Sequence, residues 1–148
     1  MRVADVAAMR SLGSALGGVA RAGDLIVLTG PLGAGKTVLA QGIGLGLGVT
    51  ERVTSPTFVI AHVHRDGRVP YVHVDAYRLS SVAEVDDLDL DASLAESVTV
   101  VEWGAGLVES LADSWLEVSI ARFEDGEERE VTLTPRGGDW ASRLAGLS

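Results

Sequence analysis

The sequence contains no cysteine and no asparagine, and lysine occurs only once. Without cysteine, thiol catalysis, cysteine-ligated metal sites and redox motifs are excluded. Without asparagine, the N-K-x-D motif that reads guanine in Ras-like GTPases cannot form. No apolar run approaches the roughly 18 residues that cross a bilayer, and no charged-then-apolar segment opens the chain. We therefore expect a soluble, cytoplasmic protein without a membrane partner.

Positive charge is also scarce, because 12 basic residues stand against 21 acidic ones and the formal net charge is -9. Independent binding to DNA or RNA depends on Lys and Arg neutralising phosphates, so this acidity opposes it. If nucleic acid is involved, we expect a partner to hold it. The length of 148 residues and the lack of a linker predict a single domain over residues 1–148.

Apolar residues recur with the periods of an α/β fold. Val3–Val19 has helical spacing, and Leu25–Thr29 and Val98–Val101 are continuous apolar runs typical of strands buried on both faces. A second helix is predicted from apolar residues every four positions over Leu39–Leu47, although the glycines within it disfavour a helix by about 1 kcal/mol each. Short helices and loops are expected around residues 80–97.

Two Asp-Gly pairs, at 66–67 and 125–126, lie between apolar runs and predict β-hairpins. Helix, buried strand, turn and helix in succession indicate an α/β sheet covered on both faces. The hairpins add antiparallel edge strands, so we expect a mixed sheet.

Residues 30–37 read Gly-Pro-Leu-Gly-Ala-Gly-Lys-Thr and match G-x-x-x-x-G-K-[ST] at every fixed position, between a predicted strand and a predicted helix. Backbone N–H groups of such a loop wrap nucleotide phosphates, Lys36 reaches the β and γ phosphates, and the Thr37 hydroxyl binds Mg²⁺. The predicted phosphate-binding residues are Leu32, Gly33, Ala34, Gly35, Lys36 and Thr37. The expected architecture is a three-layer, P-loop NTPase-like mixed sheet.

Two carboxylates follow apolar strands and could serve the metal or the attacking water. Glu102 follows Val98–Val101, and Asp75 follows the run that ends at Val74. Ligands of open α/β sheets bind outside the carboxyl ends of the strands, so both are candidates. One can hold Mg²⁺ while the other orients or activates water, and the sequence leaves open which does which.

Other polar residues carry weaker signals. Ser55 and Thr57, between the loop helix and the next strand, offer hydroxyls in a segment that could order around a γ-phosphate. His62, His64 and His73 could share one hairpin face if Asp66-Gly67 forms a two-residue turn. No cysteine or close carboxylate completes a metal ligand set there, which favours packed or solvated histidines.

Four segments occur in order: Gly30–Thr37, Val53–Phe58 (V-T-S-P-T-F), His73–Leu79 (H-V-D-A-Y-R-L) and Val101–Gly104 (V-E-W-G). Together they resemble the TsaE family of small bacterial P-loop ATPases in tRNA threonylcarbamoyladenosine (t6A) biosynthesis, over most of the chain. The resemblance implies ATP binding and hydrolysis in a complex with the TsaB and TsaD proteins. This complex transfers threonylcarbamoyl to N6 of adenosine 37, and tRNA would be met only through it.

The resemblance also implies roles for single residues. Lys36 would contact phosphate, Thr37 and Glu102 would bind Mg²⁺, Asp75 would belong to the catalytic centre, and Trp103 would lie beside the site.

The segment Ser55–Thr57 would be switch-like, and Arg129 aligns with an arginine near the family's C-terminal strand. Two alternatives stay open. In a nucleotide-gated binding module, ATP binding would set the affinity for partners, and ATP hydrolysis would be slow or incidental. A small P-loop kinase would need an arginine-bearing lid, and no segment of that length is apparent.

Overall fold

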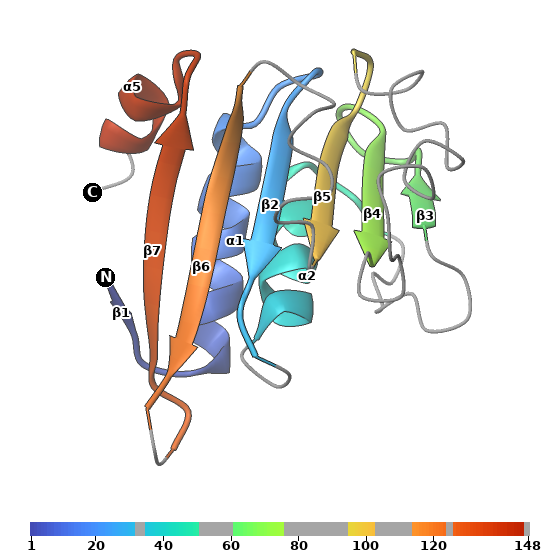
Figure 1. Cartoon of the computed structure of the whole chain (residues 1–148). Helices are drawn as coiled ribbons and strands as arrows, with labels where there is room; N and C mark the ends of the chain where they lie inside the picture. Colours follow the sequence, from blue (N-terminus) through green and yellow to red (C-terminus); the bar gives the residue numbers. More distant parts are fainter. Residues whose placement is uncertain (32–34, 51–60, 76–94, 103–113, 124–125, 147–148) are drawn as a thin grey trace.

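The computed structural model describes residues 1–31, 35–50, 61–75, 95–102, 114–123 and 126–146. Within these residues one seven-stranded sheet has the order β1-β7-β6-β2-β5-β4-β3. Its strands are β1 (Arg2–Val3), β2 (Leu25–Thr29), β3 (Ala61–His64), β4 (Tyr71–Asp75), β5 (Val98–Glu102), β6 (Trp115–Arg122) and β7 (Arg129–Arg136). The described helices are α1 (Val6–Val19), α2 (Lys36–Gly46) and α5 (Trp140–Ala145). The two longer helices, α1 and α2, lie on the same face of the sheet (Figure 1).

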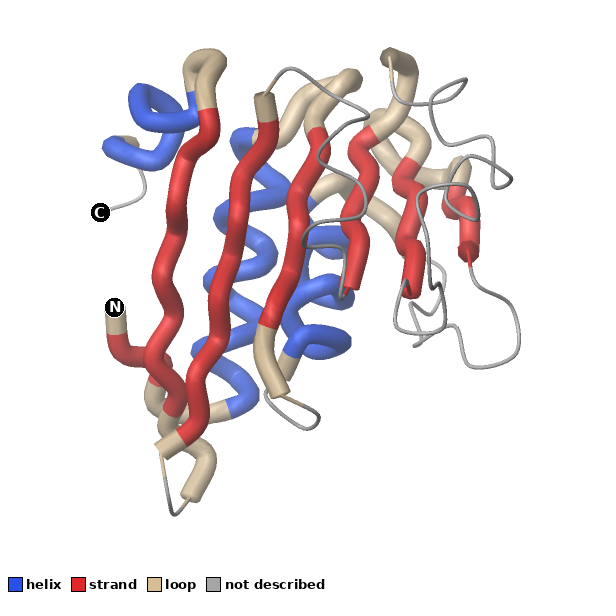
Figure 2. Tube along the Cα trace, in the orientation of Figure 1, coloured by secondary structure: helices blue, strands red, loops and turns tan. Residues whose placement is uncertain are grey.

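The centre of the sheet is parallel and its edges are antiparallel. Strand β2 pairs in parallel with β5 and β6, and β4 pairs in parallel with β5. At the edges β3 runs antiparallel to β4, β7 to β6 and β1 to β7. Figure 2 shows the strands of this sheet in red and the helices in blue. The predicted mixed α/β sheet is confirmed, whereas the short helices predicted around residues 80–97 lie mostly outside the described residues.

The two apolar runs predicted to be buried on both faces are the central strands. Leu25, Ile26, Val27 and Leu28 of β2 have no measurable exposure, and every residue of β5 is buried. Helices α1 and α2 pack their apolar sides on this part of the sheet and share its hydrophobic core. The continuous apolar sequence of these strands is therefore explained by their position.

The start of the first helix differs from the prediction. Val3 belongs to β1, where it pairs with Arg129 of β7, and its side chain is buried. Asp5 then caps α1, because its Oδ1 accepts a hydrogen bond of 2.8 Å from the backbone N–H of Ala8. The helix consequently begins at Val6, and Val3 owes its burial to the sheet edge.

Both predicted hairpins are present, but the first has a six-residue connection from 65 to 70 in place of a two-residue turn. This loop bonds to the segment after α2. The Asp66 carboxylate accepts hydrogen bonds from the Thr50 backbone N–H at 2.8 Å and hydroxyl at 2.5 Å. The backbone N–H of Arg68 donates to the Leu47 carbonyl. These contacts stabilise the longer connection. Because the connection has six residues, His62 pairs directly opposite His73.

Glycines form the contact between α1 and α2. A Cβ atom at Gly17 of α1 would meet the Ile43 carbonyl oxygen, and one at Gly46 of α2 would meet the Ser14 carbonyl oxygen. Gly13 and Gly42 are restricted in the same way by the facing backbone. The two helices therefore approach so closely that only hydrogen fits between their backbones, which explains glycines that a helix otherwise disfavours.

The last helix is anchored at the C-terminal end of α1. Trp140 is buried in the core, and the Arg143 guanidinium lies 4.0 Å from the centre of its ring. Arg143 also donates to the Asp24 carboxylate at 2.6 Å and to the Val19 carbonyl at 3.0 Å. The bond to Asp24 is the main reason that the pKa of Arg143 is raised. None of the described helices combines the length and apolar character of a membrane span.

Candidate nucleotide-binding site

The phosphate-binding motif connects β2 to α2, as the sequence predicts. Gly30 follows β2 with φ 148°, and Gly35 precedes α2 with φ 112°, a left-handed conformation that L side chains rarely adopt. Helix α2 begins at Lys36, so the positive end of its dipole and its free N–H groups face the loop. This arrangement can bind an anionic group. Leu32, Gly33 and Ala34 lie outside the described residues.

Lys36 is the buried charge of the loop, with 4% of its surface exposed. Its Nζ donates hydrogen bonds of 2.8 Å to the backbone carbonyls of Gly30 and Pro31. The ammonium is therefore held at the start of the phosphate loop. A buried ammonium with polar partners of this kind is a strong ligand for a phosphate oxygen.

Thr37 and Glu102, the two predicted metal ligands, come together although 65 positions separate them in the chain. Thr37 is in the first turn of α2, and Glu102 is the last residue of β5. The Thr37 hydroxyl lies 3.4 Å from Glu102 Oε1. Glu102 is only 4% exposed, so both oxygens of its carboxylate need partners within the protein.

The second oxygen of Glu102 is bound by His73, a contact that the sequence interpretation missed. His73 Nε2 lies 2.5 Å from Glu102 Oε2, and the histidine is fully buried. The parallel pairing of β4 with β5 is the signal that could have predicted this contact. Because these strands pair in parallel with Asp75 opposite Glu102, His73 lies two positions back on the same face.

Asp75, the other predicted carboxylate, ends β4 beside Glu102 in the sheet. Its backbone is described and its side chain is not, so its role stays a prediction. Ser55, Thr57 and Trp103 lie outside the described residues. The structure thus brings together Lys36, Thr37 and Glu102, with Asp75 at the neighbouring strand end.

Among the described residues no group of three side chains that could ligate a metal gathers, and the side chain of His62 lies outside them. His64 and His73 instead stack on Tyr71, with ring centroids 6.0 and 6.3 Å away. The Tyr71 hydroxyl donates a 2.7 Å hydrogen bond to the Ala40 carbonyl of α2. Burial, reinforced by the negative charge of Glu102, raises the pKa of Tyr71 well above its usual value.

This raised pKa predicts a loss of stability in alkali. Below pH 10 the phenol is protonated in both folded and unfolded chains, so its contribution is fully present. Above about pH 10 the unfolded chain releases this proton first, and the free energy of unfolding falls until the pKa of the folded form is passed. Urea titrations between pH 8 and 11 should show a steeper fall for the wild type than for Tyr71→Phe. Parallel curves for the two proteins would contradict the assignment.

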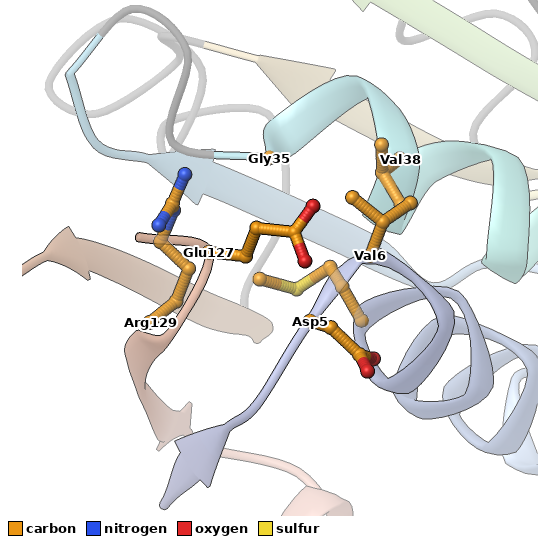
Figure 3. A pocket seen from close by; sticks show the side chains of 7 residues that line it. Asp5, Val6, Gly35, Val38, Glu127 and Arg129 are labelled. Carbon is orange, nitrogen blue, oxygen red and sulfur yellow. The ribbon is translucent and has the colours of Figure 1, made fainter. Parts of the chain in front are cut away.

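A cavity of about 190 Å³ opens beside Gly35 (Figure 3). Three segments that are distant in sequence line it: the start of α1, the start of α2 and the β6–β7 hairpin. The lining residues are Asp5, Val6, Met9, Gly35, Val38, Glu127 and Arg129. Apolar side chains and a few polar groups around a preformed hollow are typical of small-molecule sites.

Of these lining residues, Gly35 belongs to the predicted phosphate loop and Arg129 was singled out by the family resemblance, whereas the other five were missed. Arg129 is held by its own hairpin, since its Nη1 donates to the carbonyls of Gly126 at 2.9 Å and Glu128 at 3.0 Å. Met9 reaches the loop as well, because a Cβ at Gly35 would lie 3.3 Å from the Met9 methyl carbon. No local pattern marks such residues, since the cavity exists only where three distant segments meet.

Comparison with known proteins agrees with this geometry. A profile described as "Threonylcarbamoyl adenosine biosynthesis protein TsaE" matches residues 3–131. A Streptomyces coelicolor protein named "tRNA threonylcarbamoyladenosine biosynthesis protein TsaE" is 55% identical over 141 residues, covering 90% of this chain and 95% of that protein. The Bacillus subtilis protein of the same name is 40% identical, covering 87% and 80%.

Among solved structures, the crystal structure of Bacillus subtilis YdiB matches with a TM-score of 0.83 and 31% identity. The match covers 99% of this chain and 91% of that one. The resemblance seen in the sequence motifs is confirmed: this chain belongs to the TsaE family of tRNA threonylcarbamoyladenosine biosynthesis proteins.

Proposed function

We propose that this chain is a Mg²⁺-dependent, ATP-hydrolysing subunit required for threonylcarbamoylation of adenosine 37 in tRNA, acting with TsaB and TsaD. The observation that carries the proposal is the meeting of the phosphate loop with Glu102, 3.4 Å from Thr37. Family membership supports the pathway, and this geometry supports the chemistry.

Phosphate binding rests on the N-terminus of α2 and on Lys36. The helix end offers N–H donors and partial positive charge to the phosphates. The Lys36 ammonium, already 2.8 Å from two loop carbonyls, adds a full charge that can bind the β and γ oxygens. Gly35 permits close approach of the backbone because it has no side chain.

The donor set of Thr37 and Glu102 fits Mg²⁺. This ion prefers hard oxygen ligands at about 2.0–2.1 Å in octahedral geometry, so neighbouring ligand oxygens lie roughly 2.9 Å apart. The observed 3.4 Å between the Thr37 hydroxyl and Glu102 Oε1 is close to that spacing. When bound, Mg²⁺ neutralises charge on the phosphate oxygens. We assign Glu102 to the metal and Asp75 to the attacking water.

The cavity beside Gly35 is the proposed site of the nucleotide base. It adjoins the phosphate loop, and Val6, Met9 and Val38 offer apolar surface to a flat ring. Arg129 and Glu127 at its polar side can bind ring edges or stack on the base (Figure 3). The tRNA would be held by the partner proteins, in keeping with the net charge of -9.

The proposal predicts Mg²⁺-dependent ATP hydrolysis that rises when purified TsaB and TsaD are added, together with t6A formation on tRNA. Removal of Mg²⁺ with EDTA should abolish both activities. ATP turnover that is undetectable even with both partners would overturn the proposed hydrolysis. A nucleotide-gated binding module would then explain the phosphate loop, and ATP would still be expected to change the affinity for the partners.

Glu102→Gln tests the assignment of the metal ligand. The variant keeps the shape of the side chain but replaces an anionic ligand with a neutral amide. We expect the Mg²⁺ concentration for half-maximal ATP hydrolysis to rise by about tenfold, because ligand charge tunes the affinity for such ions. Glu117→Gln, which alters an ion pair between β6 and Arg136 of β7, is the matched control. An unchanged Mg²⁺ requirement in Glu102→Gln would argue for Asp75 as the main ligand.

A further inference from the structure

The contact between His73 and Glu102 has no part in the function proposed above. His73 is fully buried, and its Nε2 lies 2.5 Å from Glu102 Oε2. A carboxylate that binds a metal is commonly held by a hydrogen bond from a neighbouring group. The contact therefore bears on how Glu102 can present its oxygens.

The surroundings of His73 fix its ring so that Nε2 donates to Glu102. Its other ring nitrogen, Nδ1, is buried without a hydrogen-bond partner among the described residues. The tautomer with hydrogen on Nε2 satisfies the bond to Glu102 and leaves a bare acceptor at Nδ1, which avoids an unpaired buried donor. Tyr71 stacks on the ring at an interplanar angle of 9° and is itself bonded to Ala40. The imidazole thus cannot turn away easily.

The two oxygens of Glu102 consequently have different partners. Oε2 accepts from His73, whereas Oε1 faces the Thr37 hydroxyl at 3.4 Å. Rotation of the carboxylate to present both oxygens to one ion would move Oε2 away from His73 Nε2 and weaken or lose this hydrogen bond. This loss is costly for a residue that is only 4% exposed, because solvent cannot replace the bond.

We propose that His73 is a positioning residue that restricts Glu102 to ligation through Oε1 alone, so that the site prefers Mg²⁺ over Ca²⁺. The inference rests on the proposed function, in which Glu102 holds the metal. Mg²⁺ demands six ligands in a near-ideal octahedron, whereas Ca²⁺ takes six to eight and often binds both oxygens of a carboxylate. A carboxylate held to one free oxygen suits the smaller ion.

The test compares the affinities for Mg·ADP and Ca·ADP, measured by isothermal titration calorimetry at saturating metal. His73→Phe keeps a flat ring and removes the donor, and we expect it to lower the Mg-to-Ca affinity ratio by about tenfold. His73→Gln returns an amide N–H near the position of Nε2 and should keep the ratio within about threefold of the wild type. His64→Phe is the control, because His64 is also buried and stacked on Tyr71.

The outcomes separate this inference from the proposed function. If the wild type binds neither complex, the proposed function fails. If the wild type binds Mg·ADP and His73→Phe keeps the same ratio, or His64→Phe lowers it equally, the positioning role is overturned while the function stands.

A measurement on the wild type covers the case in which His73→Phe does not fold. Infrared difference spectra with ¹³C-labelled glutamate distinguish a carboxylate that binds through one oxygen from one that binds through two. Glu102→Gln identifies the bands that belong to this residue. Single-oxygen ligation with Mg·ADP supports the inference, and two-oxygen ligation contradicts it.

Discussion

Replacing Lys36 with methionine is expected to lower the kcat/KM of ATP hydrolysis by a factor of about 10²–10³, the usual effect of removing one donor that stabilises developing charge. Methionine keeps the apolar stem of the side chain and deletes the ammonium. Lys36 is 4% exposed and its Nζ lies 2.8 Å from two loop carbonyls, so water has little access to replace the hydrogen bonds of the ammonium. Steady-state kinetics with TsaB and TsaD present measure the effect.

Lys36→Arg is not expected to restore activity, because a planar guanidinium is larger than an ammonium and the site is buried. Arg136→Ala, which removes an exposed cation from the far end of β7, is the control and should leave kcat/KM unchanged. Thermal unfolding of each variant confirms that the fold is kept. A folded Lys36→Met protein with wild-type kinetics would rule out the assigned role of the lysine.

Replacing Gly17 with alanine is expected to lower the free energy of unfolding by about 2–3 kcal/mol. The added methyl group would meet the Ile43 carbonyl oxygen of α2, and rigid backbone on both sides leaves no side chain to move aside. Alanine is the better helix former by about 1 kcal/mol, so the packing clash must exceed that gain. Urea denaturation measures the difference.

Gly18→Ala provides a matched control one position away. A Cβ at Gly18 meets nothing within 4 Å, so the alanine should raise stability by up to about 1 kcal/mol through helix propensity alone. The two substitutions make the same chemical change in the same helix, and opposite signs are expected. Equal effects on stability would show that the close approach of α1 and α2 is not what Gly17 provides.

The amino-acid sequence determined the parts of this protein that depend on neighbours in the chain. Continuous apolar runs identified β2 and β5, because a strand buried on both faces has no polar side to show. The turn from β2 to α2 was predictable, since the motif requires Gly35, Lys36 and Thr37 at consecutive positions between a strand and a helix. Motifs in a fixed order were enough to indicate the TsaE family.

Only the tertiary structure decided which distant residues meet. Val3 has the spacing of a helical residue but pairs with β7, because a sheet edge was available and Asp5 starts the helix later. Glycine has a low helix propensity, but the glycines of α1 and α2 allow the backbones of these two helices to pack in direct contact. His73 holds Glu102 because two parallel strands lie in one register, and the cavity beside Gly35 needs three segments at once. These contacts are long-range, and the periodicity of a single segment records how that segment is buried but not what it is buried against.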